Sequence, residues 1–112
     1  MDVRRASRAF NALSQETRLK AFRLLVRAGT EGMAAGEIAR ILAVPHNTLS
    51  SHLAILVNAG LALSRREGRW VIYRIDLEGT RDLLSFLVED CCQGRPEDCA
   101  PALESVLPGC CV

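Results

Sequence analysis

The fold is decided by residues 36–75, which read GEIARILAVPHNTLSSHLAILVNAGLALSRREGRWVIYRI. Apolar residues recur at helical spacing in two short runs of its first half, and Pro45 and Asn47 indicate a turn between the runs. The first run predicts a helix over residues 36–42. The second predicts a helix that starts near Thr48 and ends at the next glycine. The inward positions of this second helix are Leu49, Leu53 and Leu56.

The period of the pattern changes to two in the rest of this stretch. Residues 61–65 and 70–75 alternate as strands do, and residues 66–69 read as a hairpin turn between them. We expect Trp70 and Tyr73 to pack the hairpin. Two short helices joined by a turn and followed by a hairpin are the outline of a winged helix-turn-helix domain. The predicted fold class is therefore mainly α with a β-hairpin wing.

Further helices are predicted on both sides of this stretch. An apolar repeat predicts a first helix that ends near Ser14, which is expected to cap a second helix that ends at Gly29. The apolar positions of the first helix are Val3, Ala6, Phe10 and Leu13, and those of the second are Leu19, Phe22, Leu25 and Val26. A last helix is predicted over residues 77–92, because Gly94 and Pro96 follow it.

Length and composition fit one small domain. The 112 residues are 49% hydrophobic, which is enough for a core. So small a domain buries only a modest share of its surface, and a partner subunit is expected. The first residues do not resemble a signal peptide, and no apolar run approaches the roughly 18 residues of a membrane span. We expect a cytoplasmic protein without a membrane partner.

The net charge of +1 conceals an asymmetry along the chain. Residues 1–74 hold 12 Lys and Arg against 5 Asp and Glu, whereas residues 75–112 hold 2 against 8. A basic body with an acidic tail indicates that the body meets a polyanion. We divide the chain into a winged helix-turn-helix domain for DNA binding and dimerisation, residues 1–92, and a cysteine-rich tail, residues 93–112.

Candidate DNA-binding residues lie on the second helix of the turn and on the hairpin. The leucine-free face of that helix carries short polar side chains that suit base edges and phosphates in a major groove. These are His46, Asn47, Thr48, Ser50 and Ser51, with Ala54 beside them. Arginines of the hairpin can lie along the phosphate backbone of double-stranded DNA. These are Arg65, Arg66 and Arg69, with Arg74 further along.

These residues carry a resemblance to a known family. LSQETRLKAFRLL (residues 13–25), the run Ser51-His52-Leu53 and the REGR segment before Tyr73 are similar to the ArsR/SmtB family of metal-sensing bacterial repressors, over about residues 8–92. The resemblance implies a homodimer, formed mainly by the first and last helices, that blocks transcription from an inverted-repeat operator until an inducer lowers its DNA affinity. We expect His52 to be a structural or phosphate-side residue and not a metal ligand.

Two inducer sites of this family are missing from the sequence. One is a Cys-x-Cys box on the helix before the recognition helix, where residues 32–38 here read GMAAGEI without a cysteine. The other uses Asp and His on the last helix, where residues 82–90 here contain no histidine. All five cysteines instead lie in the last quarter of the chain. Clustered cysteines in a reducing compartment more often bind metals or do redox chemistry than form disulfides.

Thiols therefore remain as the candidate ligands of the inducer. Three sulfurs without nitrogen ligands favour a soft, thiophilic ion, and trivalent arsenic prefers three thiolates. The tail also resembles an arsenite-responsive branch of the family with a CC-x-G…D-C-A segment, and this resemblance implies Cys91, Cys92 and Cys99 as ligands. Cys110 and Cys111 are accessory or transfer candidates, or incidental. The expected inducer is arsenite, with antimonite and methylarsenite left open.

Other functions remain open at this point. The tail could be a redox switch, or it could sense cadmium, lead or mercury in a repressor of the same fold. An enzyme is not expected, because acidic neighbours of Cys91 and Cys92 disfavour an activated thiolate and the chain has no phosphate loop or dinucleotide-binding glycine motif.

Overall fold

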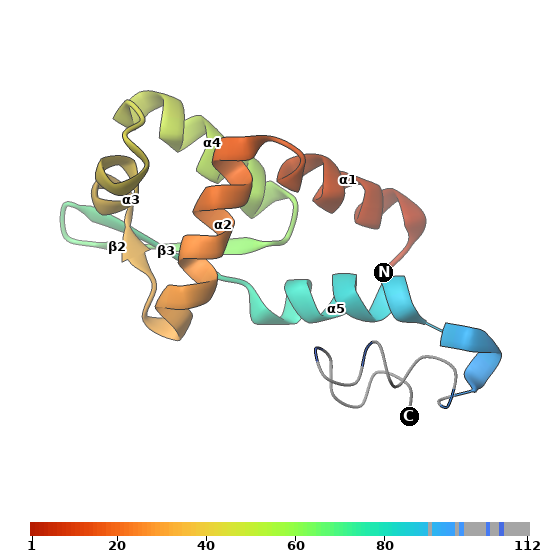
Figure 1. The fold of residues 1–112 in the computed structure, drawn as a ribbon. Helices are drawn as coiled ribbons and strands as arrows, with labels where there is room; N and C mark the ends of the chain where they lie inside the picture. Colours follow the sequence, from red (N-terminus) through yellow and green to blue (C-terminus); the bar gives the residue numbers. More distant parts are fainter. Residues whose placement is uncertain (90, 96, 98–102, 104–105, 107–112) are drawn as a thin grey trace.

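The computed structural model describes residues 1–89, 91–95, 97, 103 and 106 (Figure 1). This part of the chain contains helices and three strands in the order α1, α2, η1, β1, α3, α4, β2, β3, α5, η2. The helices are α1 (Val3–Leu13), α2 (Glu16–Ala28), α3 (Ala35–Leu42), α4 (His46–Asn58) and α5 (Leu77–Val88), with short 3-10 helices η1 (Gly29–Glu31) and η2 (Cys91–Gly94). The strands are β1 (Met33–Ala34), β2 (Ala62–Glu67) and β3 (Trp70–Ile75). This order is that of a winged helix-turn-helix domain, as predicted.

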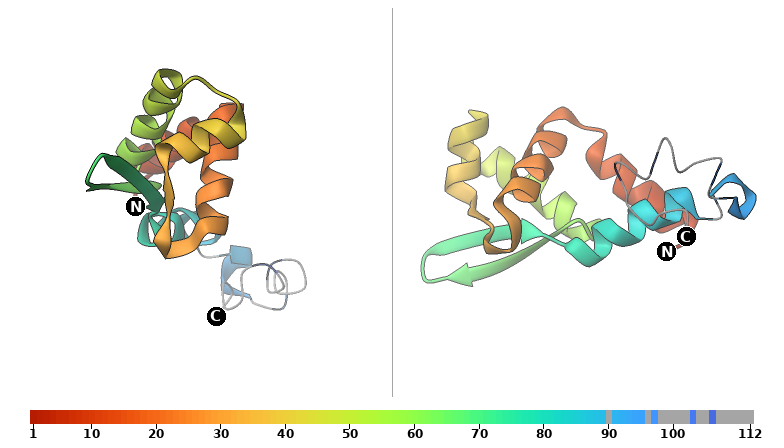
Figure 2. Two further views of the ribbon diagram at one scale, coloured as in Figure 1. Left: turned by 90° about the vertical axis from the view of Figure 1, so that its left-hand side faces the viewer. Right: turned by 60° about the horizontal axis from the view of Figure 1, so that its bottom comes forward.

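The elements fall into two groups in space (Figures 1 and 2). Helices α2, α3 and α4 pack against one another and the sheet, and the β2–β3 hairpin projects as a wing. Helices α1 and α5 lie side by side at the other end, although they are far apart in the sequence. The recognition helix candidate, α4, is thus held between the wing and the α1–α5 end.

The sheet is antiparallel with strand order β1-β3-β2. Its hairpin runs from the pair Ala62 and Ile75 to the pair Glu67 and Trp70, which leaves a turn of two residues. Gly68 in this turn has a φ of +61°, a conformation that glycine adopts readily. The predicted four-residue turn was therefore too wide. Strand β1 was not predicted, because two residues are too few to show a period.

The core consists of alanine, leucine and isoleucine side chains from several elements. The largest fully buried side chains are Leu25, Ile38, Leu49, Leu53, Leu56 and Leu61. The three predicted inward leucines of α4 are thereby confirmed. Helix α1 buries three alanines, and two residues of its predicted apolar repeat, Val3 and Phe10, are exposed. Leu19 and Val26 of the predicted apolar face of α2 are exposed as well, whereas Leu25 is buried. The apolar repeats thus predicted the two helices, but these four positions are not covered within the single chain.

Helix ends differ from the prediction at three places. Gln15, not Ser14, caps α2, because its Oε1 accepts from the backbone N–H of Arg18 at 2.9 Å. Helix α4 begins at His46, two residues earlier than predicted, with Pro45 before it. Helix α5 ends at Val88, and Cys91 and Cys92 belong to η2 and not to the helix. The predicted stop of α2 at Gly29 is confirmed.

Candidate nucleic-acid interface

The first two turns of α4 present the predicted polar face. His46, Asn47, Thr48 and Ser51 are exposed, and Ser50 is half-buried. Two of these side chains have local hydrogen bonds: Asn47 Oδ1 accepts from the N–H of Thr48 at 2.9 Å, and Ser50 Oγ donates to the His46 carbonyl at 3.0 Å. Three buried leucines fix the opposite face of the helix. The arrangement therefore leaves small hydrogen-bonding groups at an exposed helix start.

The wing arginines are not equivalent. Arg65 pairs with Glu67 at 2.9 Å through Nε and donates through Nη2 to the carbonyl of Glu31 at 3.0 Å, which ties the wing to η1. Arg66 and Arg69 are exposed and have no ion pair within the described residues. These two cations lie on either side of the Glu67-Gly68 tip. Of the three predicted wing contacts, Arg66 and Arg69 are the available ones.

The two aromatic residues of β3 have different environments. Tyr73 packs against the core, as predicted. Trp70 does not, since it is 63% exposed and borders a shallow hollow of about 420 Å³ beside the start of α3. Trp70 pairs with Glu67 at the end of the hairpin. Sequence reasoning missed this exposed indole because alternation along a strand does not show what covers each side chain.

The structure describes only two of the predicted cysteine ligands. It places the backbone of Cys91 and Cys92 in η2, directly after the helix end at Val88. Cys99, Cys110 and Cys111 lie outside the described residues. Among the described side chains, no three of His, Cys, Asp or Glu are grouped so that they could hold a metal ion. The predicted site thus stays a prediction, with two of its members in η2, a short way beyond the end of α5.

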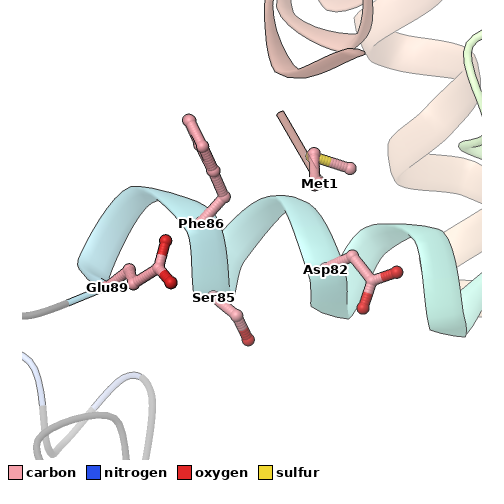
Figure 3. A pocket seen from close by; sticks show the side chains of 5 residues that line it. All are labelled: Met1, Asp82, Ser85, Phe86 and Glu89. Carbon is pink, nitrogen blue, oxygen red and sulfur yellow. The ribbon is translucent and has the colours of Figure 1, made fainter. Parts of the chain in front are cut away.

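A hollow of about 260 Å³ lies on α5 beside the N-terminus (Figure 3). It is lined by Met1, Asp82, Ser85, Phe86 and Glu89. Phe86 points to the side of Met1, whereas Ser85 points away from it. Its polar donors are two carboxylates and a hydroxyl, without a histidine. This donor set suits a hard cation better than a thiophilic ion and does not reproduce the Asp and His site of the resembled family.

Five large apolar side chains on the adjacent helices α1 and α5 are exposed, and together they form a candidate apolar face. They are Val3, Phe10, Leu77, Leu84 and Leu87. Exposed apolar surface, where it is contiguous, marks an interaction site more often than scattered residues do. Within the described part of the chain, no helix is long and apolar enough to cross a membrane.

Comparison with known proteins places these features among transcription regulators. The sequence matches the helix-turn-helix domain family over residues 13–65. It is 33% identical over 85 residues to an uncharacterized HTH-type transcriptional regulator of Methanocaldococcus jannaschii. The aligned residues cover 76% of this chain and 93% of that protein.

Two similar proteins have names that state a resistance function. The cadmium resistance transcriptional regulatory protein CadC homolog of Staphylococcus aureus is 36% identical over 84 residues, covering 75% of this chain and 65% of that protein. The arsenic resistance transcriptional regulator ArsR1 of Pseudomonas putida is 35% identical over 69 residues, covering 62% and 52%. The chain therefore aligns with less than two thirds of either regulator.

A solved structure shares the fold. It is the homodimeric winged helix-turn-helix DNA-binding domain of a possible ArsR-family transcriptional regulator from Mycobacterium bovis. The TM-score is 0.64 and the sequence identity 25%, with 83% of this chain and 86% of that chain covered.

Proposed function

We propose that this chain, which belongs to the ArsR family of DNA-binding helix-turn-helix transcriptional regulators, is a repressor that leaves its operator when trivalent arsenic binds its C-terminal thiolates. The family is not enzymatic. The observation that carries the proposal is the position of Cys91 and Cys92 immediately beyond α5, the helix whose exposed apolar face fits a dimer interface.

In the proposed complex, α4 lies in the major groove and the wing follows the backbone. The exposed side chains at the start of α4 reach base edges, and Arg66 and Arg69 neutralise phosphates. Two such domains related by a two-fold axis match two half-sites about one helical turn, roughly 34 Å, apart on an inverted repeat. The operator is expected to be such a repeat.

The proposed dimer forms through the exposed apolar face of α1 and α5. Val3 and Phe10, which belong to the apolar repeat of α1, are exposed in the single chain and become buried against a partner in this arrangement. The same holds for Leu84 and Leu87 on α5. Burial of apolar surface at about 25 cal/mol per Å² supplies the driving force for such an association. The homodimeric relative of this fold supports the proposal.

The proposed inducer site consists of Cys91, Cys92 and Cys99. Adjacent cysteines in η2 can supply two sulfurs, and Cys99 is seven residues further along the chain. Soft thiolates select soft ions, and binding the ion drives loss of the thiol protons. The arsenic resistance regulator among the similar proteins supports this choice, and the cadmium regulator makes cadmium the alternative.

Release of DNA follows from the attachment of this site to α5. An ion held by the three thiolates ties the tail to the end of the dimer helix and shifts the two winged domains relative to each other. The recognition helices then no longer match the half-site spacing. Allosteric couplings of this kind are worth about 1–3 kcal/mol, which corresponds to roughly 5- to 150-fold in operator affinity.

The test measures release from DNA. An inverted-repeat duplex, selected by the wild-type protein from a random library, is labelled, and its anisotropy is followed while arsenite, antimonite or cadmium is added. Arsenite should release the wild type. Serine at Cys91, Cys92 or Cys99 should preserve DNA binding and abolish release, whereas serine at Cys110 serves as the matched control and should release normally.

Three outcomes would count against the proposal. If all three serine variants still release DNA with arsenite, the ligand assignment is wrong. If only cadmium releases the wild type, the inducer is wrong and the repressor assignment stands. If the protein selects no duplex, the repressor assignment itself fails.

A further inference from the structure

Arg18, in the first turn of α2, binds the end of α1. Its Nε donates to the carbonyl of Ala12 at 2.7 Å, and its Nη2 donates to the carbonyl of Asn11 at 3.5 Å. These carbonyls belong to the last turn of α1, where helix carbonyls lack partners within the helix and a cation is favourable. The guanidinium therefore fixes the corner between α1 and α2.

The same guanidinium also reaches α4. Its Nη1 lies 3.2 Å from Nδ1 of His52, and both residues are half-buried. A guanidinium has donors only, so Nδ1 of His52 must accept and the ring proton must be on Nε2. Nδ1 of His52 is thereby occupied by the guanidinium of Arg18. This agrees with the structural role expected from the sequence.

One side chain thus joins three helices with different tasks. Helix α1 carries part of the apolar face of the proposed dimer, and α4 carries the proposed DNA contacts. Among the side-chain hydrogen bonds of the described residues, the bond from Arg18 to His52 is the one that joins α4 to another helix. The leucines beneath α4 bury apolar surface, which is favourable but has no directional preference. The hydrogen bonds of Arg18 do have a preferred direction and can therefore fix the orientation of α4.

We infer that Arg18 is a positioning residue that sets the orientation of α4 relative to α1, and through it the separation of the two recognition helices in the dimer. The inference rests on the proposed dimeric repressor. A change at this corner would leave the DNA-contacting side chains themselves intact. With one recognition helix bound in its half-site, such a change would shift the position of the second recognition helix along the DNA. The variant should therefore differ from the wild type in the half-site spacing that it prefers.

The test compares Arg18→Gln with Arg23→Gln, an exposed arginine of the same helix without a hydrogen bond or ion pair within the described part of the chain. Both variants lose one positive charge. Binding is measured on the selected inverted repeat, on repeats whose half-sites are one base pair closer or farther apart, and on non-specific DNA. Urea unfolding is measured beside each variant.

Arg18→Gln should bind the selected repeat about tenfold more weakly, the size of one lost hydrogen bond to a partly buried partner. It should also lose its preference among the three spacings. Arg23→Gln should keep that preference, and both should bind non-specific DNA alike. A merely structural role would lower the unfolding midpoint without altering the spacing preference.

His52→Leu provides a second arm if Arg18→Gln fails to fold, because it leaves the bonds of Arg18 to α1 in place. The loss of operator affinity in the double variant should be smaller than the sum of the losses in the two single variants, since both substitutions remove the same bond between Arg18 and His52. Retained spacing preference in both Arg18→Gln and His52→Leu would overturn the inference. A wild type that prefers no inverted repeat at any spacing would overturn the proposed function and this inference with it.

Discussion

The arginines of the wing should differ in their contribution to DNA affinity. Arg66 and Arg69 are exposed without an ion pair in the described structure, whereas Arg65 is bound to Glu67 and to the carbonyl of Glu31. Each phosphate contact releases condensed counterions, and its loss reduces the slope of log affinity against log salt by about one. Because the proposed dimer carries each arginine twice, we predict that Arg66→Gln and Arg69→Gln each reduce this slope by about two.

Arg65→Gln is the matched control for these variants. It removes one positive charge from the same hairpin, as the other two variants do. The Arg65 side chain already has two partners within the protein, so the slope should change by much less than one. The measurement is a salt titration of operator binding by anisotropy. Equal slopes for all three variants would mean that Arg65 contacts a DNA phosphate despite its bonds to Glu67 and Glu31.

At the scale of elements, α5 makes a close backbone contact with the turn between α4 and β2. Gly79 lies against the carbonyl of Gly60, and a methyl group added at Gly79 would overlap that oxygen. The N–H of Asp76 also donates to the carbonyl of Leu61 at 3.0 Å. Because the obstacle is backbone, it cannot rotate away. We predict that Gly79→Ala destabilises the fold by about 1–3 kcal/mol, as overpacking does.

Gly36→Ala is the control, because a methyl group there meets nothing within 4 Å and the residue is also in a helix. It should leave stability unchanged or raise it by about 0.4–1 kcal/mol through reduced freedom of the unfolded chain. Urea unfolding of both variants decides the matter. A Gly79→Ala variant as stable as Gly36→Ala would show that α5 shifts away from the turn after α4 at no cost.

The apolar repeat in the sequence predicted a helix and its buried side where the same chain covers the apolar residues. Leu49, Leu53 and Leu56 repeat every three or four residues and are buried, so α4 was found. The same reasoning failed for Phe10, because an apolar repeat does not say whether its cover is the same chain or a second one. The cap at Gln15 was missed because a serine beside it is the commoner cap.

At the scale of the whole molecule, the sequence predicts a DNA-binding part and a separate sensing part. The polar face of α4 and the basic wing could be predicted, since they depend on residues adjacent in the chain. The availability of Arg66 compared with Arg65, and the reach of Arg18 to His52, depend on contacts between distant segments and could not. The thiol site rests on the tail's sequence pattern and on the place of Cys91 and Cys92 after α5.

Association of two chains is the property on which the proposed repressor depends. Leu87 on α5 is 55% exposed and belongs to the apolar face shared with α1, whereas Leu19 on α2 is 44% exposed and lies outside that face. A charge placed in a dimer interface loses its hydration without a partner, which costs more than about 1–3 kcal/mol and raises the dissociation constant at least tenfold. We predict that Leu87→Glu yields monomers in sedimentation equilibrium at concentrations where the wild type is dimeric, and that operator affinity falls with dimerisation. Leu19→Glu should remain a dimer with unchanged affinity, because the same charge there stays in water. If both variants sediment as the wild type does, the subunits meet on another surface, and the route from the thiol site through α5 to the DNA would have to be sought there.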